Sequence, residues 1–324
     1  MILILSKAES EYSTEDIMDW LEHYDAPYIR VNGEDVLENI NYKDGSLSFK
    51  NFSLEQINVC WFRRSISENY FDETIVGIES NYDNKAEILK YLGREYKTLQ
   101  QLFIKKLQSK KWLSHPKEAN VNKLNVLEVA KEVGLNIPKT LVTTEKKELL
   151  EFISKVGDVI SKPLGETSFF RDKKQIHSLK TCLITKESLK DIPNSFFPTL
   201  FQEQINKSFE LRIFYMDNTF YPMAIFSQND EKTKVDFRNY NLDRPNRKTP
   251  YLLEQDIENA LHILVNKLGL TSGSLDLIKT LDNQYVFLEV NPIGQFGMTS
   301  SPCNYFLEEK IAQYLIQQNE ERNL

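Results

Sequence analysis

The sequence SLDLIKTLDNQYVFLEVNP, residues 274–292, contains two strand-like runs separated by Asp282 and Asn283. An Asp-Asn pair between two apolar runs is a strong turn signal, so this segment predicts an antiparallel β-hairpin. Asp276 lies six residues before Asp282, and Glu289 lies six residues after Asn283. The two carboxylates should therefore lie near each other on adjacent strands. Asn291 lies two residues after Glu289 and should share its face.

Strict alternation along the second strand also predicts the direction of the apolar side chains. Phe287 is expected on the face of Glu289 and Asn291, while Leu288 and Val290 are expected in the core.

The predicted hairpin gathers three oxygen donors, two of them anionic. Such donors suit Mg²⁺, which prefers oxygen ligands and often takes phosphate oxygens and waters as the remainder. We therefore interpret Asp276, Glu289 and Asn291 as metal ligands. A second interpretation fits the same residues, in which the two carboxylates pair separately with lysines at a sheet edge.

The chain as a whole has 324 residues, which suggests two domains or three small ones. Its 41% apolar and 27% charged residues are an ordinary globular composition with enough apolar side chains for sizeable cores. The formal charge of −7 disfavours a nucleic-acid partner. Three scattered cysteines indicate a reducing compartment, and the start MILILSKAES resembles neither a signal peptide nor a membrane span. We expect a cytoplasmic protein with no membrane partner.

The N-terminal part reads as a small α/β layer that ends in a linker. We expect strands at 1–5, 27–32 and 57–64, a helix around 17–24, a long helix at 84–109, and a linker, SKKWLSHP, at 109–116. The pair Arg63–Arg64 after the third strand could line a cleft or form a structural ion pair.

A second unit is predicted from about residue 117. It should open with a helix that ends at Gly134, and strands and helices should alternate up to about residue 200. Beyond that point the pattern is rich in strands, interrupted by a polar run at 229–248 and a helix at 254–268.

Two lysines are candidates for phosphate binding. Lys162 ends the apolar strand ISKPL, and Lys123 follows Asn122 at a helix start, where backbone N–H groups attract anions. Each could equally be a surface lysine, since no P-loop pattern GxxxxGK[ST] contains either.

The stretch FQEQINKSFELRIFY, residues 201–215, places Glu203 at the end of one strand and Glu210 at the start of the next. Exposed backbone at Gln204 and Ile205 could read an adenine edge, and a carboxylate could hold ribose hydroxyls. A plain hairpin with a polar loop explains the segment as well.

Taken in order, these motifs resemble the ATP-grasp superfamily. The matching residues are Lys123, Lys162, Glu203, Glu210, Asp276, Glu289 and Asn291. The resemblance implies an α/β fold that becomes α+β in the C-terminal half, with a nucleotide between two α+β subdomains. It implies a pre-ATP-grasp domain at 1–114, a central subdomain at 115–200 and a C-terminal subdomain at 201–324. ELRIF, with Arg212, resembles the RimK-like branch, which joins a carboxylate to an amine.

A closer resemblance covers nearly the whole chain. The start MILILS, WFRR at 61–64 and the tail NPIGQFGMTSSPCNYFLEEKIA are similar to graspetide (microviridin-type) peptide maturases of the grasp-with-spasm subgroup. VDFRNY, residues 235–240, resembles that family's D-x-R element. Two features depart from the family. Its phosphate-covering loop is often rich in glycine, whereas the loop GETSFFRDKK, residues 165–174, has one glycine. Some relatives have an arginine where this chain has Ser274.

The resemblance implies a function and roles for the residues. The expected enzyme uses ATP and two Mg²⁺ ions to activate Asp or Glu side chains of a ribosomal precursor peptide and joins them to Thr, Ser or Lys side chains. Arg212 would steady the transferred phosphoryl group, Arg238 would pair with an acidic peptide side chain, and Asp236 would orient Arg238 or act as a base. A leader-bearing precursor, a homodimer and a SPASM-domain pathway protein are the implied partners.

Two other functions use the same residues. A RimK-like ligase would add amino acids to a protein or peptide terminus, with the same nucleotide site. A non-catalytic nucleotide- or peptide-binding module would keep the fold without turnover. The identity of the precursor, the ring pattern and the choice of ester or amide are not encoded in any of these motifs.

Overall fold

The computed structural model describes residues 1–8, 11–33, 35, 40–49, 52–64, 84–165, 169–171, 176–178, 181–230, 232–239 and 241–321. Contacts divide the chain into two compact units. Unit 1 comprises Met1–Asn120, Gln295–Ser300 and Tyr305–Leu324, and unit 2 comprises Val121–Gly294 and Ser301–Asn304. The division into three domains stays a prediction.

Unit 1 is built on a parallel sheet of strand order β2-β1-β6-β7. Its strands are β1 (Ile2–Ser6), β2 (Tyr28–Asn32), β6 (Val59–Phe62) and β7 (Lys111–Leu113). β1 is buried along its whole length, as expected for a central parallel strand. The predicted linker at 109–116 is therefore wrong in part, because its KWL segment is the edge strand β7.

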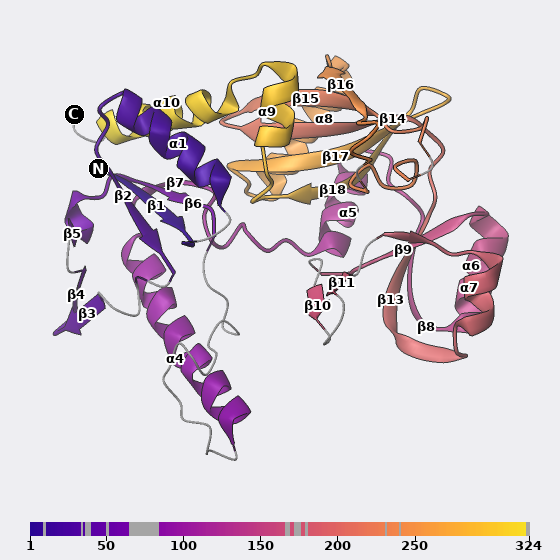
Figure 1. The fold of residues 1–324 in the computed structure, drawn as a ribbon, viewed down its shortest axis with the longest axis horizontal. Helices are drawn as coiled ribbons and strands as arrows, with labels where there is room; N and C mark the ends of the chain where they lie inside the picture. The colour runs from indigo at the N-terminus through magenta and orange to yellow at the C-terminus, as the bar shows by residue number, and fades with distance from the viewer. Residues whose placement is uncertain are drawn as a thin grey trace. The chain divides into compact units, whose positions relative to one another are not determined.

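The described helices of unit 1 include α1 (Tyr12–His23), α4 (Lys85–Lys106) and α10 (Leu307–Glu320) (Figure 1). A three-stranded antiparallel sheet, β3 (Ile40–Lys43), β4 (Ser46–Phe49) and β5 (Phe52–Ser53), is followed by the short 3-10 helix η1 (Leu54–Gln56). Phe49 lies against Phe52 and against Phe103 of α4, with ring centroids 4.9 and 5.0 Å away. These rings tie the small sheet to the core of unit 1.

Arg63 and Arg64 of the WFRR segment both pair with the buried carboxylate of Glu11. Arg63 Nε lies 3.8 Å from Glu11 Oε2, and Arg64 Nε lies 3.0 Å from Glu11 Oε1. Burial lowers the pKa of Arg63 to about 10, so it stays a cation near neutral pH. The structural alternative for this pair is thereby confirmed.

The smaller sheet of unit 2 is antiparallel, in the order β12-β9-β13-β8. Its strands are β8 (Thr140–Glu145), β9 (Val159–Lys162), β12 (Cys182–Leu183) and β13 (Ser195–Glu203), with helices α6 (Lys146–Val156) and α7 (Lys186–Asp191). A separate ladder joins β10 (Phe169–Arg171) and β11 (Ile176–Ser178). Of the loop at 165–174, residues 166–168 and 172–174 lie outside the described residues.

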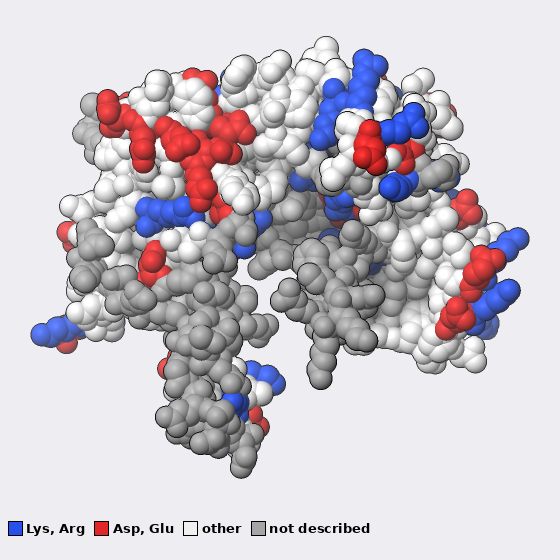
Figure 2. Space-filling view, viewed as in Figure 1, with Lys and Arg blue, Asp and Glu red and all other residues white. Residues whose placement is uncertain are grey.

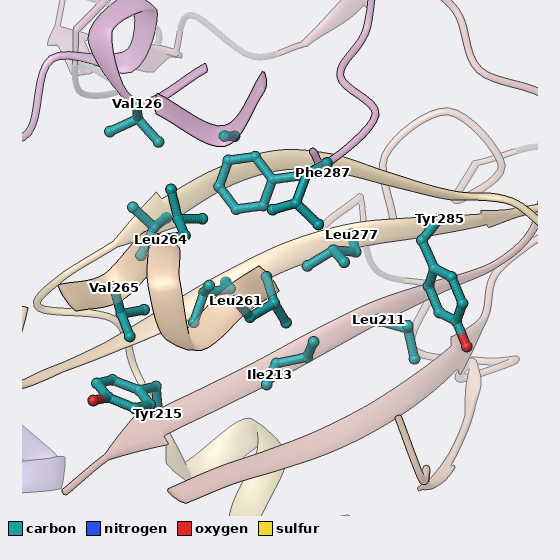
Figure 3. Packing of buried hydrophobic residues seen from close by; sticks show 14 of the residues in the cluster. Val126, Leu211, Ile213, Tyr215, Leu261, Leu264, Val265, Leu277, Tyr285 and Phe287 are labelled. Carbon is teal, nitrogen blue, oxygen red and sulfur yellow. The ribbon is translucent and has the colours of Figure 1, made fainter. Parts of the chain in front are cut away.

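The larger sheet of unit 2 is also antiparallel, in the order β16-β15-β14-β17-β18. Its strands are β14 (Lys207–Met216), β15 (Thr219–Phe226), β16 (Arg247–Pro250), β17 (Ser272–Thr280) and β18 (Tyr285–Asn291). The helices α5 (Lys123–Glu132) and α8 (Gln255–Lys267) cover one face, where the main core lies (Figure 3). The short helix α9 (Gly297–Cys303) follows β18 along the chain.

The predicted hairpin is confirmed as β17–β18. Asn283 occupies its turn with φ of 62°, a left-handed conformation that asparagine tolerates well. Gly134, at φ of 88°, follows the end of α5 as predicted.

β18 contains a β-bulge that overturns part of the predicted alternation. Leu277 pairs with Phe287 and Asp276 pairs with Glu289, so Leu288 is an extra residue on its strand. Phe287 is fully buried in the core with Val290, whereas Leu288 and Glu289 both line a cavity at the other face. The placement of Phe287 beside Glu289 and of Leu288 in the core is wrong, because the bulge interrupts the two-residue period.

Charge is unevenly distributed over the surface. Acidic side chains gather over α1 and α10 of unit 1 in Figure 2, and Lys and Arg side chains gather near β16 of unit 2. Burial and the nearby carboxylates of Glu308, Asp19 and Glu15 raise the pKa of Asp16 within the acidic group. No helix in the described part of the chain is long and apolar enough to cross a membrane.

The bulge predicts unequal effects for two neighbouring truncations. Phe287→Ala should lower the free energy of unfolding by about 3–5 kcal/mol, because it empties a space in the closed core. Leu288→Ala should cost about 1 kcal/mol or less, since the side chain is only partly buried. Urea unfolding followed by circular dichroism measures both. Equal losses, or a larger loss at Leu288, would contradict the bulged pairing.

Candidate functional site

A cavity in unit 2 combines apolar and charged side chains. Its apolar lining includes Ile160 of β9, Ile205 after β13, Ile278 of β17 and Leu288 of β18. The charged residues that line it are Lys162, Glu203, Lys207, Glu210, Lys234, Asp236, Arg238, Asp276 and Glu289. Such a lining can hold a flat apolar group and a polyanion together.

Three charged residues form a row across β14, β17 and β18. Arg212 pairs with Asp276, and Asp276 pairs with Glu289, in direct register. Arg212 Nη1 lies 2.9 and 2.7 Å from the two carboxylate oxygens of Asp276, and both side chains are buried. Burial raises the pKa of Asp276, the Arg212 charge opposes this, and the Glu289 charge adds to it.

Arg212 also has an unused donor. Its Nε is buried and has no hydrogen-bond partner among the described residues. A buried N–H without an acceptor is costly, so Arg212 is retained in this row at some expense in stability.

Glu289 is surrounded by cations from three other segments. Its Oε2 lies 3.8 Å from both Lys123 Nζ and Lys162 Nζ, and its Oε1 lies 3.7 Å from Arg238 Nη1. Burial by itself would raise the pKa of Glu289, but Lys162, Lys123 and Arg238 together bring it below the usual range. Glu289 thus pairs with two lysines, as the second interpretation of the hairpin predicted, while Asp276 pairs with an arginine.

The two predicted phosphate lysines converge, although they belong to different elements. Lys162 ends β9, and burial lowers its pKa, with Glu289 opposing that shift and Lys123 adding to it. Lys123 opens α5 and donates from Nζ to the Pro163 carbonyl at 3.1 Å.

The helix start itself contributes less than predicted. Asn122 Oδ1 accepts hydrogen bonds from the N–H groups of Leu124 and Asn125, at 3.0 and 3.2 Å. These two donors are therefore already used by the N-cap, and the ammonium of Lys123 is what the α5 start offers to an anion.

Asp236 and Arg238 form a fork-shaped pair. Arg238 Nε and Nη2 each donate at 2.9 Å to a different oxygen of Asp236, and the Arg238 backbone N–H donates to Oδ1 at 3.0 Å. Burial would raise the pKa of Asp236, but these bonds to Arg238 hold it below the usual range. Both oxygens are occupied, so the geometry favours the orienting role of Asp236 over the role of a base.

The crossing between β13 and β14 holds the remaining predicted residues. Glu203 Oε1 accepts from the Lys139 backbone N–H at 2.8 Å, and the Gln204 N–H donates to the Asp158 carbonyl at 2.8 Å. The Gln204 donor is therefore committed within the protein, which leaves the backbone of Ile205 as the candidate for reading a base edge.

Asn291 lies at the exposed end of β18, where its Oδ1 accepts from the Ile293 N–H at 3.1 Å. The described residues contain no group of three or more His, Cys, Asp or Glu placed to hold a metal. Two carboxylates and one amide fit a Mg²⁺ ion whose other ligands are phosphate oxygens and waters. They do not form a closed cage for a metal by themselves.

Comparisons with known proteins identify the fold. No protein-family model matches the sequence, and no match was found among curated protein sequences. Among solved structures, macrocyclase MdnC of Microcystis aeruginosa, bound with precursor peptide MdnA, is 25% identical with a TM-score of 0.81, over 98% of this chain and 99% of its own. The chain has the fold of an ATP-grasp peptide ligase.

Two further solved structures support the fold assignment. A RiPP-associated ATP-grasp ligase of Chryseobacterium gregarium, in complex with ADP and a leader and core peptide, is 23% identical with a TM-score of 0.81, over 99% of this chain and 96% of its own. Macrocyclase MdnB of Microcystis aeruginosa is 25% identical with a TM-score of 0.71, over 97% and 98%. The ATP-grasp fold predicted from the order of the motifs is confirmed.

Within this ATP-grasp fold, unit 2 brings the predicted lysines, Asp236, Arg238, Arg212 and the hairpin carboxylates together. Sequence reasoning missed Lys207 and Ser227, whose side chains both donate to Glu210 Oε1, at 2.6 and 2.7 Å. No motif marks them, because Ser227 reaches Glu210 only through the pairing of β14 with β15, and Lys207 lies where the register of β14 with β17 shifts.

The cation-filled site predicts that metal binding depends on nucleotide. With Glu289 held by three cations, Mn²⁺ should bind weakly to the free protein and about tenfold or more tightly when ADP draws the lysines to its phosphates. Electron paramagnetic resonance of Mn²⁺ with and without ADP measures this coupling. Glu289→Gln should abolish it, and Glu132→Gln, at an exposed pair with Lys267, should not. Equal Mn²⁺ affinity in both states would contradict the assignment.

Proposed function

We propose that this chain is an ATP- and Mg²⁺-dependent ligase that phosphorylates Asp or Glu side chains of a ribosomal precursor peptide and joins them to Thr, Ser or Lys side chains. The observation that carries the proposal is the convergence of Lys123, Lys162 and Arg238 on Glu289, next to the Arg212–Asp276 pair. The full-length similarity to a macrocyclase bound with its precursor peptide supports the substrate class.

The nucleotide would lie along the cavity of unit 2. Its base would pack against Ile160, Ile205 and Leu288, whose side chains supply an apolar lining. Glu203 and Glu210 would face the base and ribose hydroxyls, and Lys123 and Lys162 would hold the phosphates. The lowered pKa of Lys162 shows that nearby carboxylates do not fully compensate the burial of its charge. A bound phosphate would supply the missing negative charge.

Asp276, Glu289 and Asn291 would hold the magnesium. When bound, the metal would neutralise charge on the transferred phosphoryl group. The hairpin fixes these three side chains on one face through backbone pairing, because Asn291 lies opposite Ser274 and Glu289 opposite Asp276. Rigid placement of this kind reduces the reorganisation needed during the reaction.

The reaction proceeds in two substitutions. A carboxylate oxygen of the peptide attacks the γ-phosphorus of ATP, the bond to the β-phosphate oxygen breaks, and ADP leaves behind an acyl phosphate. A hydroxyl or amine of the peptide then attacks the acyl carbon and loses its proton, and inorganic phosphate departs. The guanidinium of Arg212, held beside the cavity by Asp276, would steady the transferred phosphoryl group by its positive charge.

Arg238 would present a cation to the acidic peptide side chain. Asp236 holds its guanidinium by two hydrogen bonds and leaves Nη1 directed at Glu289, 3.7 Å away. With Glu289 serving as a magnesium ligand, Nη1 would be free to pair with a peptide carboxylate. Local cations of this kind allow a chain with net charge −7 to bind an acidic peptide.

The proposal extends to the setting of the enzyme. Cys60, Cys182 and Cys303 are all free, which supports a reducing cytoplasmic location. A homodimer and a SPASM-domain pathway partner, which the resemblance implies, stay predictions.

The deciding experiment is mass spectrometry of a precursor peptide incubated with the chain, ATP and Mg²⁺. Each cross-link should remove the mass of one water, whereas a RimK-like ligase would add the mass of an amino acid. A nucleotide-binding module without turnover would leave the mass unchanged. The double change Glu289→Gln with Asn291→Ala should abolish product, and full activity of that variant would refute the metal assignment.

The Asp236–Arg238 fork predicts a selective defect. Arg238→Lys keeps the charge but loses the fork, so kcat/KM for the peptide should fall about tenfold to a hundredfold, the size of one hydrogen bond to a charged group at this half-exposed side chain. Asp236→Asn should give a milder fall in the same parameter. Steady-state kinetics should show a KM for ATP within about threefold of normal in both variants, because neither residue is assigned to the nucleotide. An increase confined to the KM for ATP would contradict the peptide role.

A further inference from the structure

Lys207 is a buried cation that lines the cavity, and it has no assigned role in nucleotide binding. It is the first residue of β14, and its side chain is 4% exposed. Its Nζ donates to Glu210 Oε1 at 2.6 Å and to the Val235 carbonyl at 3.2 Å. Burying an ammonium group is costly, so a lysine in this place must be compensated by the carboxylate it contacts.

Ser227, the residue after β15, reaches the same carboxylate oxygen. Its Oγ donates to Glu210 Oε1 at 2.7 Å, and Ser227 is fully buried. Glu210 Oε1 therefore has two donors, one charged and one neutral. Glu210 Oε2 accepts no hydrogen bond from any described residue and is not among the buried unpartnered atoms, while the side chain lines the cavity.

The surroundings of Glu210 also set its charge. Burial raises the pKa of Glu210, and Asp276 adds to this, while the charge and hydrogen bond of Lys207 and the hydroxyl of Ser227 oppose it. Removal of Lys207 would leave the burial effect opposed by Ser227 alone. A carboxyl group without these donors could also rotate, because neither oxygen would be fixed.

We propose that Lys207 and Ser227 are positioning residues that hold Glu210 with one oxygen open to the cavity as an acceptor for ribose hydroxyls. They thereby set the preference for ribonucleotides over deoxyribonucleotides. This inference rests on the proposed function, in which ATP occupies the cavity and Glu210 faces the ribose. A site built to bind a hydroxyl rejects the analogue that lacks it, because its acceptor is left without a partner.

The test compares kcat/KM for ATP, 2′-deoxy-ATP and 3′-deoxy-ATP in the peptide-dependent reaction of the full chain. The unmodified protein should prefer ATP over at least one deoxy analogue by about tenfold to a hundredfold, the effect of one hydrogen bond to a charged acceptor. Lys207→Met should lower kcat/KM for ATP by most of that factor and leave the deoxy value nearly unchanged, so that the preference collapses. Ser227→Ala should reduce the preference in part.

The matched control is Lys267→Met, the same substitution at an exposed lysine that pairs with Glu132 at 3.2 Å. It should keep the full preference. Lys207→Arg, which retains a charged donor, should restore part of the preference lost in Lys207→Met. If Lys207→Met does not fold, Ser227→Ala and Lys207→Arg decide the matter, because each retains at least one donor to Glu210.

An equal loss for ATP and its deoxy analogues would show a merely structural role and overturn the inference, as would an unchanged preference in every variant. These results leave the proposed function standing, since the unmodified protein would still turn over ATP. Failure of the unmodified protein to bind ADP in calorimetry, or to use ATP, would instead overturn both.

Discussion

The row of Arg212, Asp276 and Glu289 across three neighbouring strands is the constraint on which unit 2 depends. Each of these side chains is flanked along its strand by residues that point into the core under α5 and α8, such as Leu211, Leu275 and Val290. A slip of one residue would exchange the two faces and bury the charges in hydrocarbon. The hydrophobic core and the charged site therefore fix the same register, and neither can form correctly without the other.

The site is held together by charges that also prepare it for a ligand. The ammonium groups of Lys123 and Lys162 compensate Glu289, and Arg212 compensates Asp276. Buried charges without partners would be far more costly than these pairs. In the proposed function, the lysines would pair with nucleotide phosphates and the carboxylates would hold magnesium. The total charge of the site would therefore stay nearly balanced.

Much of this arrangement could be predicted from the sequence, because it depends on residue types at fixed spacing. The Asp282–Asn283 turn signal predicts the hairpin, but the register next to the turn would place Asp276 opposite Leu288, and the bulge is what brings Glu289 opposite Asp276. The bulge at Leu288 could not be predicted, since it is a local irregularity of the backbone. The KWL strand is too short to show a period, and Ser227 reaches Glu210 only through the pairing of Glu210 with Ile225 in the next strand. The order of the motifs thus predicted the fold, whereas the details of strand pairing and the exact direction of side chains could not be predicted.

The extra residue in β18 has a consequence for protein engineering. Before the bulge, odd-numbered positions such as Tyr285 and Phe287 face the core, and after it the even-numbered Val290 does so. The alternation of core-facing and cavity-facing side chains therefore changes phase within the strand, at the point where Leu288 and Glu289 both face the cavity. Anyone who transplants this hairpin to another scaffold, or diversifies it in a library, must treat its two halves as separate patterns and keep the joint between them intact.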